Sequence, residues 1–255
     1  MITFQNVSKT YPNGVVGVRD VSLTINRGEF IVLIGLSGAG KSTLLRTINR
    51  LTETTEGVVL VDGESVTGAS SRDVRRIRGT IGMIFQSFNL VGVSTVQRNV
   101  IVGRLAHMPA WKGSLGLFSK ADYALVDDAL SRVGLSDKLF SRADQLSGGQ
   151  QQRVAIARAL VQQPSVLLAD EPVASLDPVS TDRVLADVRA ISQQLGITVI
   201  TSLHSVALAR KWATRVIGMR DGGVVFDGLP EEATDARLAE IYGDEYAALK
   251  SEDAS

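Results

Sequence analysis

The sequence predicts an α/β fold with an antiparallel β lobe at the N-terminus and an inserted α-helical lobe. Three stretches carry this prediction. Residues 1–35 are strand-like, residues from about Thr95 to Val161 have mostly helical periodicity, and from Ser165 onward strands alternate with helices. Such alternation is typical of a largely parallel sheet with helices on both faces. With 255 residues, 44% of them hydrophobic and 21% charged, the chain is long enough to bury a substantial core.

The N-terminal strands are expected at Ile2–Val7, Val16–Ile25 and Phe30–Ile34. The last of these is a continuous apolar run, which indicates a strand covered on both faces. A glycine-rich turn follows it, and then a helix at Ser42–Leu51 whose apolar residues recur at helical spacing. The order strand, glycine-rich loop, helix is therefore expected near residue 40.

The next elements are a strand and turn at Val58–Gly63 and a strand at Thr80–Phe85, ahead of the helical insert. The alternating part is expected to contain strands at Ser165–Ala169, Ile197–Thr201, Thr214–Met219 and Val224–Phe226, and helices at Pro178–Leu195 and near Val206–Trp212. The domain is expected to cover residues 1–246, with the β lobe and core in 1–86 and 165–228 and the helical lobe in 87–164. Residues 247–255 are expected to form a flexible tail.

Composition excludes several classes of protein. Lys plus Arg and Asp plus Glu both number 27, so binding to nucleic acid through bulk charge is not expected. The chain has no cysteine, which excludes disulfides, thiol chemistry and cysteine-ligated metals. Its apolar runs are only strand-sized, so attachment to a membrane would require another chain.

A loop that fits G-x-x-x-x-G-K-[ST] lies between the apolar strand and the helix, where this pattern has its meaning. Glycines let successive backbone N–H groups point at phosphate oxygens, and the helix N-terminus adds partial positive charge. Lys41 is expected to reach the β- and γ-phosphates, and the Ser42 hydroxyl is expected to bind Mg²⁺. The predicted nucleotide-binding residues here are Gly35, Leu36, Ser37, Gly38, Ala39, Gly40, Lys41, Ser42 and Thr43.

Two adjacent carboxylates end a second apolar strand. Asp170 is expected to hold Mg²⁺ through water, and Glu171, one residue further out, to face the γ-phosphate and polarise the attacking water. Alone, the segment Val166–Glu171 could be an ordinary strand that ends in two solvated acidic residues. Together with the upstream loop it predicts a nucleoside triphosphatase.

A third motif lies between these two. Ser147, Gly148, Gly149 and Gln150 follow Leu146 and open an amphipathic helix, which is a second N-terminus suited to phosphate. This LSGGQ stretch, in this order relative to the other motifs, resembles the signature of ATP-binding-cassette (ABC) ATPases. The resemblance extends from Ile2 to about Gly228 and implies a P-loop NTPase (RecA-like) core.

The resemblance also implies further site residues. Gln86 matches a glutamine that contacts Mg²⁺ and the attacking water, and His204 matches a histidine that contacts the γ-phosphate. Tyr11 matches an aromatic residue that stacks on adenine, and Asp177 lies in a loop that crosses a dimer interface. Each is weak evidence alone, and His107 matches no motif.

The family also implies partners and a location. Two cassettes face each other so that the phosphate loop of one and Ser147–Gln150 of the other enclose the same ATP, so a second copy is expected. Membrane permease subunits and, indirectly, an extracytoplasmic solute-binding protein are expected partners. The chain is then expected at the cytoplasmic face of the plasma membrane.

The segments outside the catalytic motifs resemble the ATP-binding subunits of phosphonate importers. They include Ile101–Leu105 and Trp111–Phe118 in the insert, Ala174 before the Asp177 loop, and Ser205 where many relatives have an acid. Uptake of phosphonate or a related phosphorus oxyanion is therefore expected. A cassette of another importer, of an exporter or of a lipid extraction system is the alternative.

Overall fold

The computed structural model describes residues 1–246, and the expected tail at 247–255 lies outside the described residues. The chain divides into two compact units, one formed by residues 1–77 and the segment that begins at Thr198, and one formed by Arg78–Ile197. The second unit contains two strands and a long helix in addition to the expected helical lobe, so its bounds are wider than 87–164.

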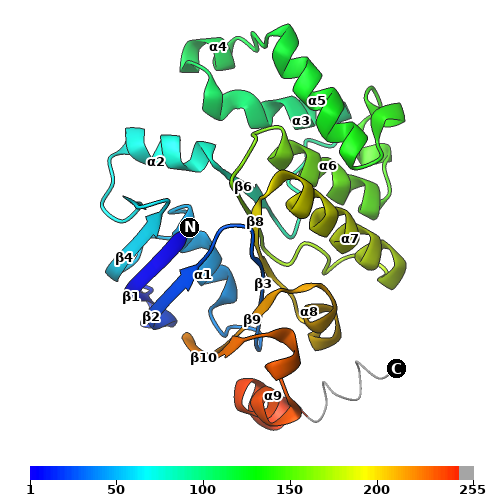
Figure 1. Ribbon diagram of the computed structural model, residues 1–255. Helices are drawn as coiled ribbons and strands as arrows, with labels where there is room; N and C mark the ends of the chain where they lie inside the picture. Colours follow the sequence, from blue (N-terminus) through cyan, green and yellow to red (C-terminus); the bar gives the residue numbers. More distant parts are fainter. Residues whose placement is uncertain (247–255) are drawn as a thin grey trace. The chain divides into compact units, whose positions relative to one another are not determined.

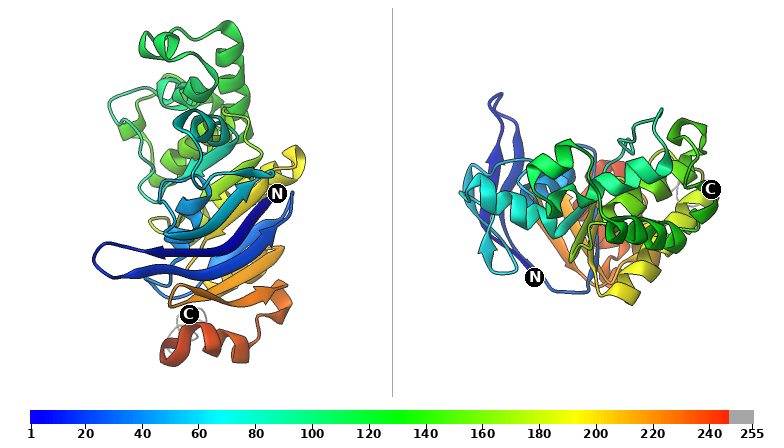
Figure 2. Two further views of the ribbon diagram at one scale, coloured as in Figure 1. Left: turned by 90° about the vertical axis from the view of Figure 1, so that its left-hand side faces the viewer. Right: turned by 90° about the horizontal axis from the view of Figure 1, so that it is seen from above.

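The first unit contains an antiparallel sheet in the order β2-β1-β4-β5 (Figure 1). Its strands are β1 (Ile2–Thr10), β2 (Val16–Ile25), β4 (Glu56–Val61) and β5 (Glu64–Ser65). In β1 and β2, Ile2 pairs with Ile25, and both side chains are buried. The long dark-blue hairpin of these two strands is clearest in the left view of Figure 2. The predicted antiparallel β lobe is confirmed.

The first unit also contains the strands that position the phosphate loop. Strand β3 (Phe30–Ile34) is parallel to both β8 (Thr198–Ser202) and β9 (Arg215–Arg220), and β10 (Gly223–Gly228) is antiparallel to β9. All five residues of β3 are buried, as its continuous apolar run predicts. The helices of this unit are α1 (Lys41–Ile48), α8 (Val206–Trp212) and α9 (Asp235–Tyr242), with short 3₁₀ segments η4 (Pro230–Glu232) and η5 (Gly243–Glu245).

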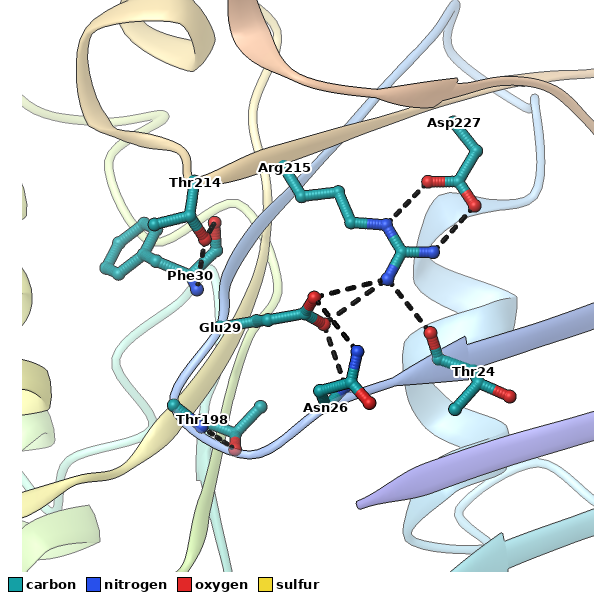
Figure 3. Close-up of polar contacts among 9 residues, drawn as sticks. Thr24, Asn26, Glu29, Phe30, Thr198, Thr214, Arg215 and Asp227 are labelled. Atoms are coloured by element: carbon teal, nitrogen blue, oxygen red, sulfur yellow. Dashed lines mark hydrogen bonds and ion pairs between the residues drawn. The ribbon is translucent and has the colours of Figure 1, made fainter.

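Arg215 links these two groups of strands (Figure 3). Its guanidinium donates to both carboxylate oxygens of Asp227, at 2.6 and 2.7 Å, and to the backbone oxygen of Thr24 in β2, at 2.9 Å. It also contacts Glu29 just before β3. Hydrogen bonding to Asp227 raises the pKa of Arg215 above its ordinary value. The charged guanidinium joins the antiparallel sheet to the strand that carries the phosphate loop.

The second unit contains a parallel strand pair and the helical insert. Strand β6 (Ile81–Ile84) pairs with β7 (Val166–Ala169), so that Ile84 is opposite Ala169. Helices α3, α5 and α6 pack together in Figure 1. The helices are α3 (Val96–Ile101), α4 (Ala110–Ser114), α5 (Lys120–Arg132), α6 (Gly148–Leu160) and α7 (Pro178–Leu195), with 3₁₀ segments η1 (Val102–His107), η2 (Ser136–Lys138) and η3 (Ala143–Gln145).

Two helices were not expected from the sequence. Helix α2 (Ser71–Gly79) spans the boundary between the two ranges and buries Val74, Ile77 and Gly79, and α9 lies beyond the last expected strand. In α2 only Val74 and Ile77 are apolar, and two apolar residues three positions apart are too short a pattern to predict a helix on their own. Within residues 1–246, no helix combines the length and the hydropathy needed to cross a bilayer.

Candidate functional site

The phosphate loop leaves β3 in a conformation that only glycine accommodates. Gly35, Gly38 and Gly40 have φ values of 142°, 81° and 102°. A Cβ at Gly35 would lie 2.2 Å from the backbone oxygen of Met219, and one at Gly40 would lie 2.2 Å from that of Gly17. The backbone angles favour glycine at all three positions, and close packing also requires it at Gly35 and Gly40.

Lys41 is 4% exposed, and its ammonium group curls back over the loop. The Nζ donates to the backbone oxygens of Gly35 and Leu36, at 2.7 and 2.9 Å. Gly40 is the N-cap of α1, which begins at Lys41, so the positive end of that helix is at the loop. A cation, a helix N-terminus and a glycine backbone thus converge where the sequence predicts a phosphate cradle.

Tyr11 lies next to the first turn of α1. Its hydroxyl is 3.0 Å from the hydroxyl of Thr43, and Lys9 lies over its ring, with Nζ 5.3 Å from the centroid. A Cβ at Gly17 would lie 2.8 Å from Cε2 of Tyr11. The expected adenine-stacking residue and a residue of the predicted cradle are therefore in direct contact.

Two glycines of this site were not expected. The backbone oxygen of Gly17 lies where a Cβ of Gly40 would be, and the backbone N–H of Gly222 donates to the oxygen of Ala39 at 3.1 Å. Gly222 lies in the sequence Asp221-Gly222-Gly223, which indicates a turn but not a contact with the phosphate loop. Gly17 lies in a strand pattern, where an isolated glycine is a signal for close backbone approach.

His204 follows β8 at the edge where the phosphate loop leaves β3. Because Leu33 is opposite Ser202 in this parallel pair, His204 is level with Gly35. The backbone N–H of Leu203 donates to the oxygen of Leu33 at 3.1 Å, and His204 itself is exposed. His204 therefore lies at the same strand edge as the start of the phosphate loop.

In the second unit, one strand edge collects three predicted site residues. Ile84 and Ala169 are opposite each other in the parallel pair. Gln86 and Glu171 therefore each lie two residues beyond a paired residue, and Asp170 directly precedes Glu171. Asp170 is 3% exposed, and its backbone N–H donates to the oxygen of Ile84 at 3.0 Å. Glu171 has a left-handed φ of 49°, a strained conformation of the kind found at functional sites.

Ser147 caps helix α6 as the sequence predicts. Its hydroxyl accepts from the backbone N–H of Gln150 at 3.4 Å, and the Gln150 side chain accepts from the N–H of Ser147 at 3.0 Å. A Cβ at Gly149 would lie 3.3 Å from the hydroxyl of Ser180, and one at Gly148 would lie 3.5 Å from Leu176. The signature glycines therefore lie against the start of α7.

Asp177 is the N-cap of α7, and its side chain accepts from the N–H of Ser180 at 2.9 Å. This hydrogen bonding holds the pKa of Asp177 below its ordinary value. The structure thus gives Asp177 a capping role in its own chain, in addition to the interface role implied by resemblance.

The oxygen-rich donor set that the sequence assigns to Mg²⁺ fits that ion. Ser42 offers a hydroxyl, Gln86 an amide oxygen and Asp170 a buried carboxylate, and Mg²⁺ prefers such hard donors. No cluster of three or more His, Asp or Glu side chains suited to a metal occurs among residues 1–246.

Comparison with known proteins decides the family. A family model described as ABC transporter matches residues 18–174. The chain belongs to the ABC transporter family. The resemblance drawn from the motifs and the expected α/β cassette fold are both confirmed, and with them the class of ATP-hydrolysing transport subunit.

Two curated proteins illustrate how far the similarity of this cassette extends. It is 57% identical over 252 residues to a phosphonates import ATP-binding protein of Bacillus thuringiensis, covering 99% of this chain and 97% of that protein. It is 55% identical over 242 residues to a protein of the same name from Lactobacillus johnsonii, covering 95% of both.

Solved structures agree with this cassette fold. The dimeric bacterial cassette MJ0796 is 33% identical, with a TM-score of 0.80 over 90% of this chain and 99% of that one. A post-hydrolysis dimer of MJ0796, bound to ADP and Pi, is 33% identical with a TM-score of 0.77 over the same shares.

Proposed function

We propose that this chain is the ATP-hydrolysing subunit of an importer for phosphonate or a related phosphorus oxyanion. The observation that carries the proposal is 57% identity, over 99% of the chain, to a protein named for phosphonates import. The cassette itself carries the nucleotide motifs, and the solute is assigned through this similarity alone.

In the proposed ATP site, the glycine loop binds phosphate oxygens through its backbone N–H groups, and Lys41 exchanges its bonds to Gly35 and Leu36 for bonds to phosphate. The Tyr11 ring stacks on adenine, and His204 donates to the γ-phosphate. Since each of these groups lies in the first unit, that unit supplies most of the nucleotide affinity.

The second unit supplies the proposed hydrolytic groups. Glu171 orients and polarises the attacking water, and Gln86 positions that water from the neighbouring strand end. Gln86 and Asp170 are the proposed Mg²⁺ ligands of this unit, and Ser42 is the proposed ligand of the first unit. When bound, this ion neutralises charge that develops on the phosphates.

A second copy of the chain completes the proposed site. An open phosphate loop leaves one side of the γ-phosphate in water, and the α6 N-terminus of another copy, with Ser147, Gly148, Gly149 and Gln150, can close it. The dimer of MJ0796 supports this arrangement. Asp177, exposed at the start of α7, is then at the dimer interface.

The proposed permease contact is the segment after Gln86. Val91 and Val93 are 59% and 71% exposed, whereas Val96 and Val100 are fully buried in the helical core. The stretch therefore has an exposed apolar start, suited to a permease helix, and a structural end. A solute-binding protein outside the membrane would deliver solute to that permease, with this chain bound at the cytoplasmic face of the plasma membrane.

The decisive experiment on hydrolysis is Glu171→Gln. The amide keeps the shape of the side chain but not the carboxylate, so turnover should fall by about 10² to 10⁴ while ATP affinity is kept. The matched control is Glu56→Gln, an exposed glutamate at the start of β4. Full ATPase activity in Glu171→Gln would remove Glu171 from its proposed role.

The solute is tested by reconstitution of the chain with candidate permease subunits and a candidate solute-binding protein. ATP-dependent uptake of methylphosphonate into proteoliposomes should exceed uptake of sulfate or sugars. Uptake of an unrelated solute only, or transport in the outward direction, would favour the alternative transporter classes.

A further inference from the structure

The backbone directly after Gln86 makes a turn that is unusual for its residue types. Phe88 and Asn89 have φ values of 54° and 51°, so two consecutive non-glycine residues are left-handed. Such residues adopt this conformation singly and at a cost, and they keep it only where surrounding contacts determine it. The contacts that hold this turn therefore also decide where the chain leaves Gln86.

The main contact comes from Arg158, 69 and 70 residues further along the chain. Its Nη1 donates to the backbone oxygen of Asn89 and its Nη2 to that of Phe88, each at 2.6 Å. Both strained residues are thus held by one planar fork, in which a charged donor meets two carbonyls. Arg158 is partly buried, and this burial lowers its pKa below the ordinary value.

The backbone that carries Arg158 is itself fixed. A Cβ at Gly103 would lie 2.3 Å from the backbone oxygen of Arg158 and 2.6 Å from Cγ1 of Val161. The segment η1 therefore packs directly on the end of α6, where only glycine fits. At its other end, α6 begins at the Ser147 cap, so a single 13-residue helix joins the signature motif to the turn after Gln86.

Arg158 also lines a cavity of about 760 Å³ in the helical lobe, together with Asn89, Val91, Phe118 and Tyr123. Arg158 and the Phe88–Asn89 turn that it holds, called the clamp below, thus border the same cavity as Val91, at the exposed start of the proposed permease segment. An occupant of that hollow would touch the guanidinium or the residues it holds.

We propose that Arg158 is a positioning residue that holds the Phe88–Asn89 turn and thereby sets the place of the Gln86 amide relative to helix α6. The proposal rests on the proposed role of Gln86 in hydrolysis. If Arg158 holds the turn, helix α6 and Gln86 move together as one body. A ligand in the cavity that contacts Arg158 or Asn89 would then shift the position of Gln86.

The test compares Arg158→Lys with wild type. Lysine keeps the charge and loses the planar fork, so it cannot hold two consecutive carbonyls in the same way. We expect kcat for ATP hydrolysis to fall about tenfold, while the Kd for ATP stays within about twofold because the phosphate loop is untouched. Arg132→Met, which removes an arginine that pairs with Asp128 on α5, is the control and should change neither constant.

A double-mutant cycle separates positioning from a general structural effect. In a Gln86→Ala background, Arg158→Lys should cause no further loss of kcat, since the amide that it positions is gone. Equal losses in both backgrounds would overturn the proposal. Loss of activity in Glu171→Gln tests the proposed function independently, so failure of one does not imply failure of the other.

A rescue variant uses the strain of the turn. Asn89→Gly lets the residue adopt a left-handed φ without a clamp, so it should restore most of the kcat lost in Arg158→Lys. If Arg158→Lys does not fold, Asn89→Val destabilises the same turn with Arg158 intact, because a β-branched residue adopts a left-handed φ poorly. It should give the same loss of kcat at an unchanged Kd for ATP. Wild-type kcat in a folded Asn89→Val, or no rescue by Asn89→Gly, would overturn the proposal.

Discussion

The phosphate loop and the turn after Gln86 solve a similar problem in two ways. Each contains residues with positive φ, and in each a cationic side chain donates hydrogen bonds to two consecutive backbone carbonyls. Lys41 bonds to Gly35 and Leu36, and Arg158 bonds to Phe88 and Asn89. The difference lies in the residues that make the turn, which are glycines in the first and a phenylalanine and an asparagine in the second.

This difference matches what each cation is expected to do. Lys41 must leave its carbonyls when it binds phosphate, so the loop has to keep its shape without that contact, and glycine makes this possible. Arg158 has no such second task in the proposed mechanism. The turn that it holds can therefore use residues that depend on the clamp, which ties the position of Gln86 to helix α6.

The largest effect is expected where a glycine of the loop is replaced. Gly40→Ala adds a Cβ 2.2 Å from the oxygen of Gly17 at a φ of 102°. Strain and overpacking together should lower the free energy of unfolding by about 2 to 5 kcal/mol and abolish ATP binding. Thermal unfolding and nucleotide titration measure both.

Gly38→Ala is the matched control for that prediction. It has a φ of 81°, but no described atom lies within 4 Å of its Cβ position. Only the backbone term should then be lost, about 1 kcal/mol. Equal losses at the two positions would mean that close packing against Gly17 has no part in shaping the loop.

A smaller effect is expected at the clamped turn. Asn89→Ala should lower the free energy of unfolding by about 1 kcal/mol, because alanine tolerates a left-handed φ less well than asparagine, whereas Asn89→Gly should stay within about 0.5 kcal/mol of wild type. Ser87→Ala, exposed and without a positive φ, is the control. An Asn89→Ala variant with the same free energy of unfolding as wild type would show that the turn is not strained.

The sequence predicts some elements to the residue and leaves others hidden. Helix α7 has the predicted bounds because Asp177 caps it, Pro178 starts it and Gly196, with a φ of 66°, ends it. The phosphate loop, the Ser147 cap and the strand-end carboxylates are likewise local patterns. All of them depend on neighbours in the sequence.

The features that the sequence did not predict depend on distant neighbours. Arg158 reads as an ordinary polar position on an amphipathic helix, and nothing near it indicates a bond to residues 88 and 89. Phe88 carries no signal for a left-handed backbone. The contact of Gly17 with Gly40 likewise joins separate elements. Short-range periodicity cannot report such contacts.

The smallest expected effect distinguishes Arg158 from a second arginine of the same unit. Arg104 donates to the carboxylate of Asp122 at 3.0 Å and to the backbone oxygen of Val161 at 3.1 Å, and the Arg104–Asp122 pair is only 13% and 15% exposed. Burial acts to raise the pKa of Asp122, but hydrogen bonds from Ser119 and Arg104 outweigh it, so this pKa lies below its ordinary value. Arg104 therefore depends on a titratable partner, whereas Arg158 holds neutral carbonyls.

A folded-state pKa below the ordinary value means that Asp122 stabilises the fold above its unfolded-state pKa, near 4, and that this contribution disappears as pH falls through the folded-state value. Asp122→Asn should thus cost about 0.5 kcal/mol at pH 7 and progressively less below pH 4, while the cost of Arg158→Lys should not change with pH over that range. Asp127→Asn, an exposed position on the same helix, is the control. Urea unfolding between pH 3 and pH 7 measures all three, and a pH-independent cost for Asp122→Asn would mean that its interactions do not need the charge.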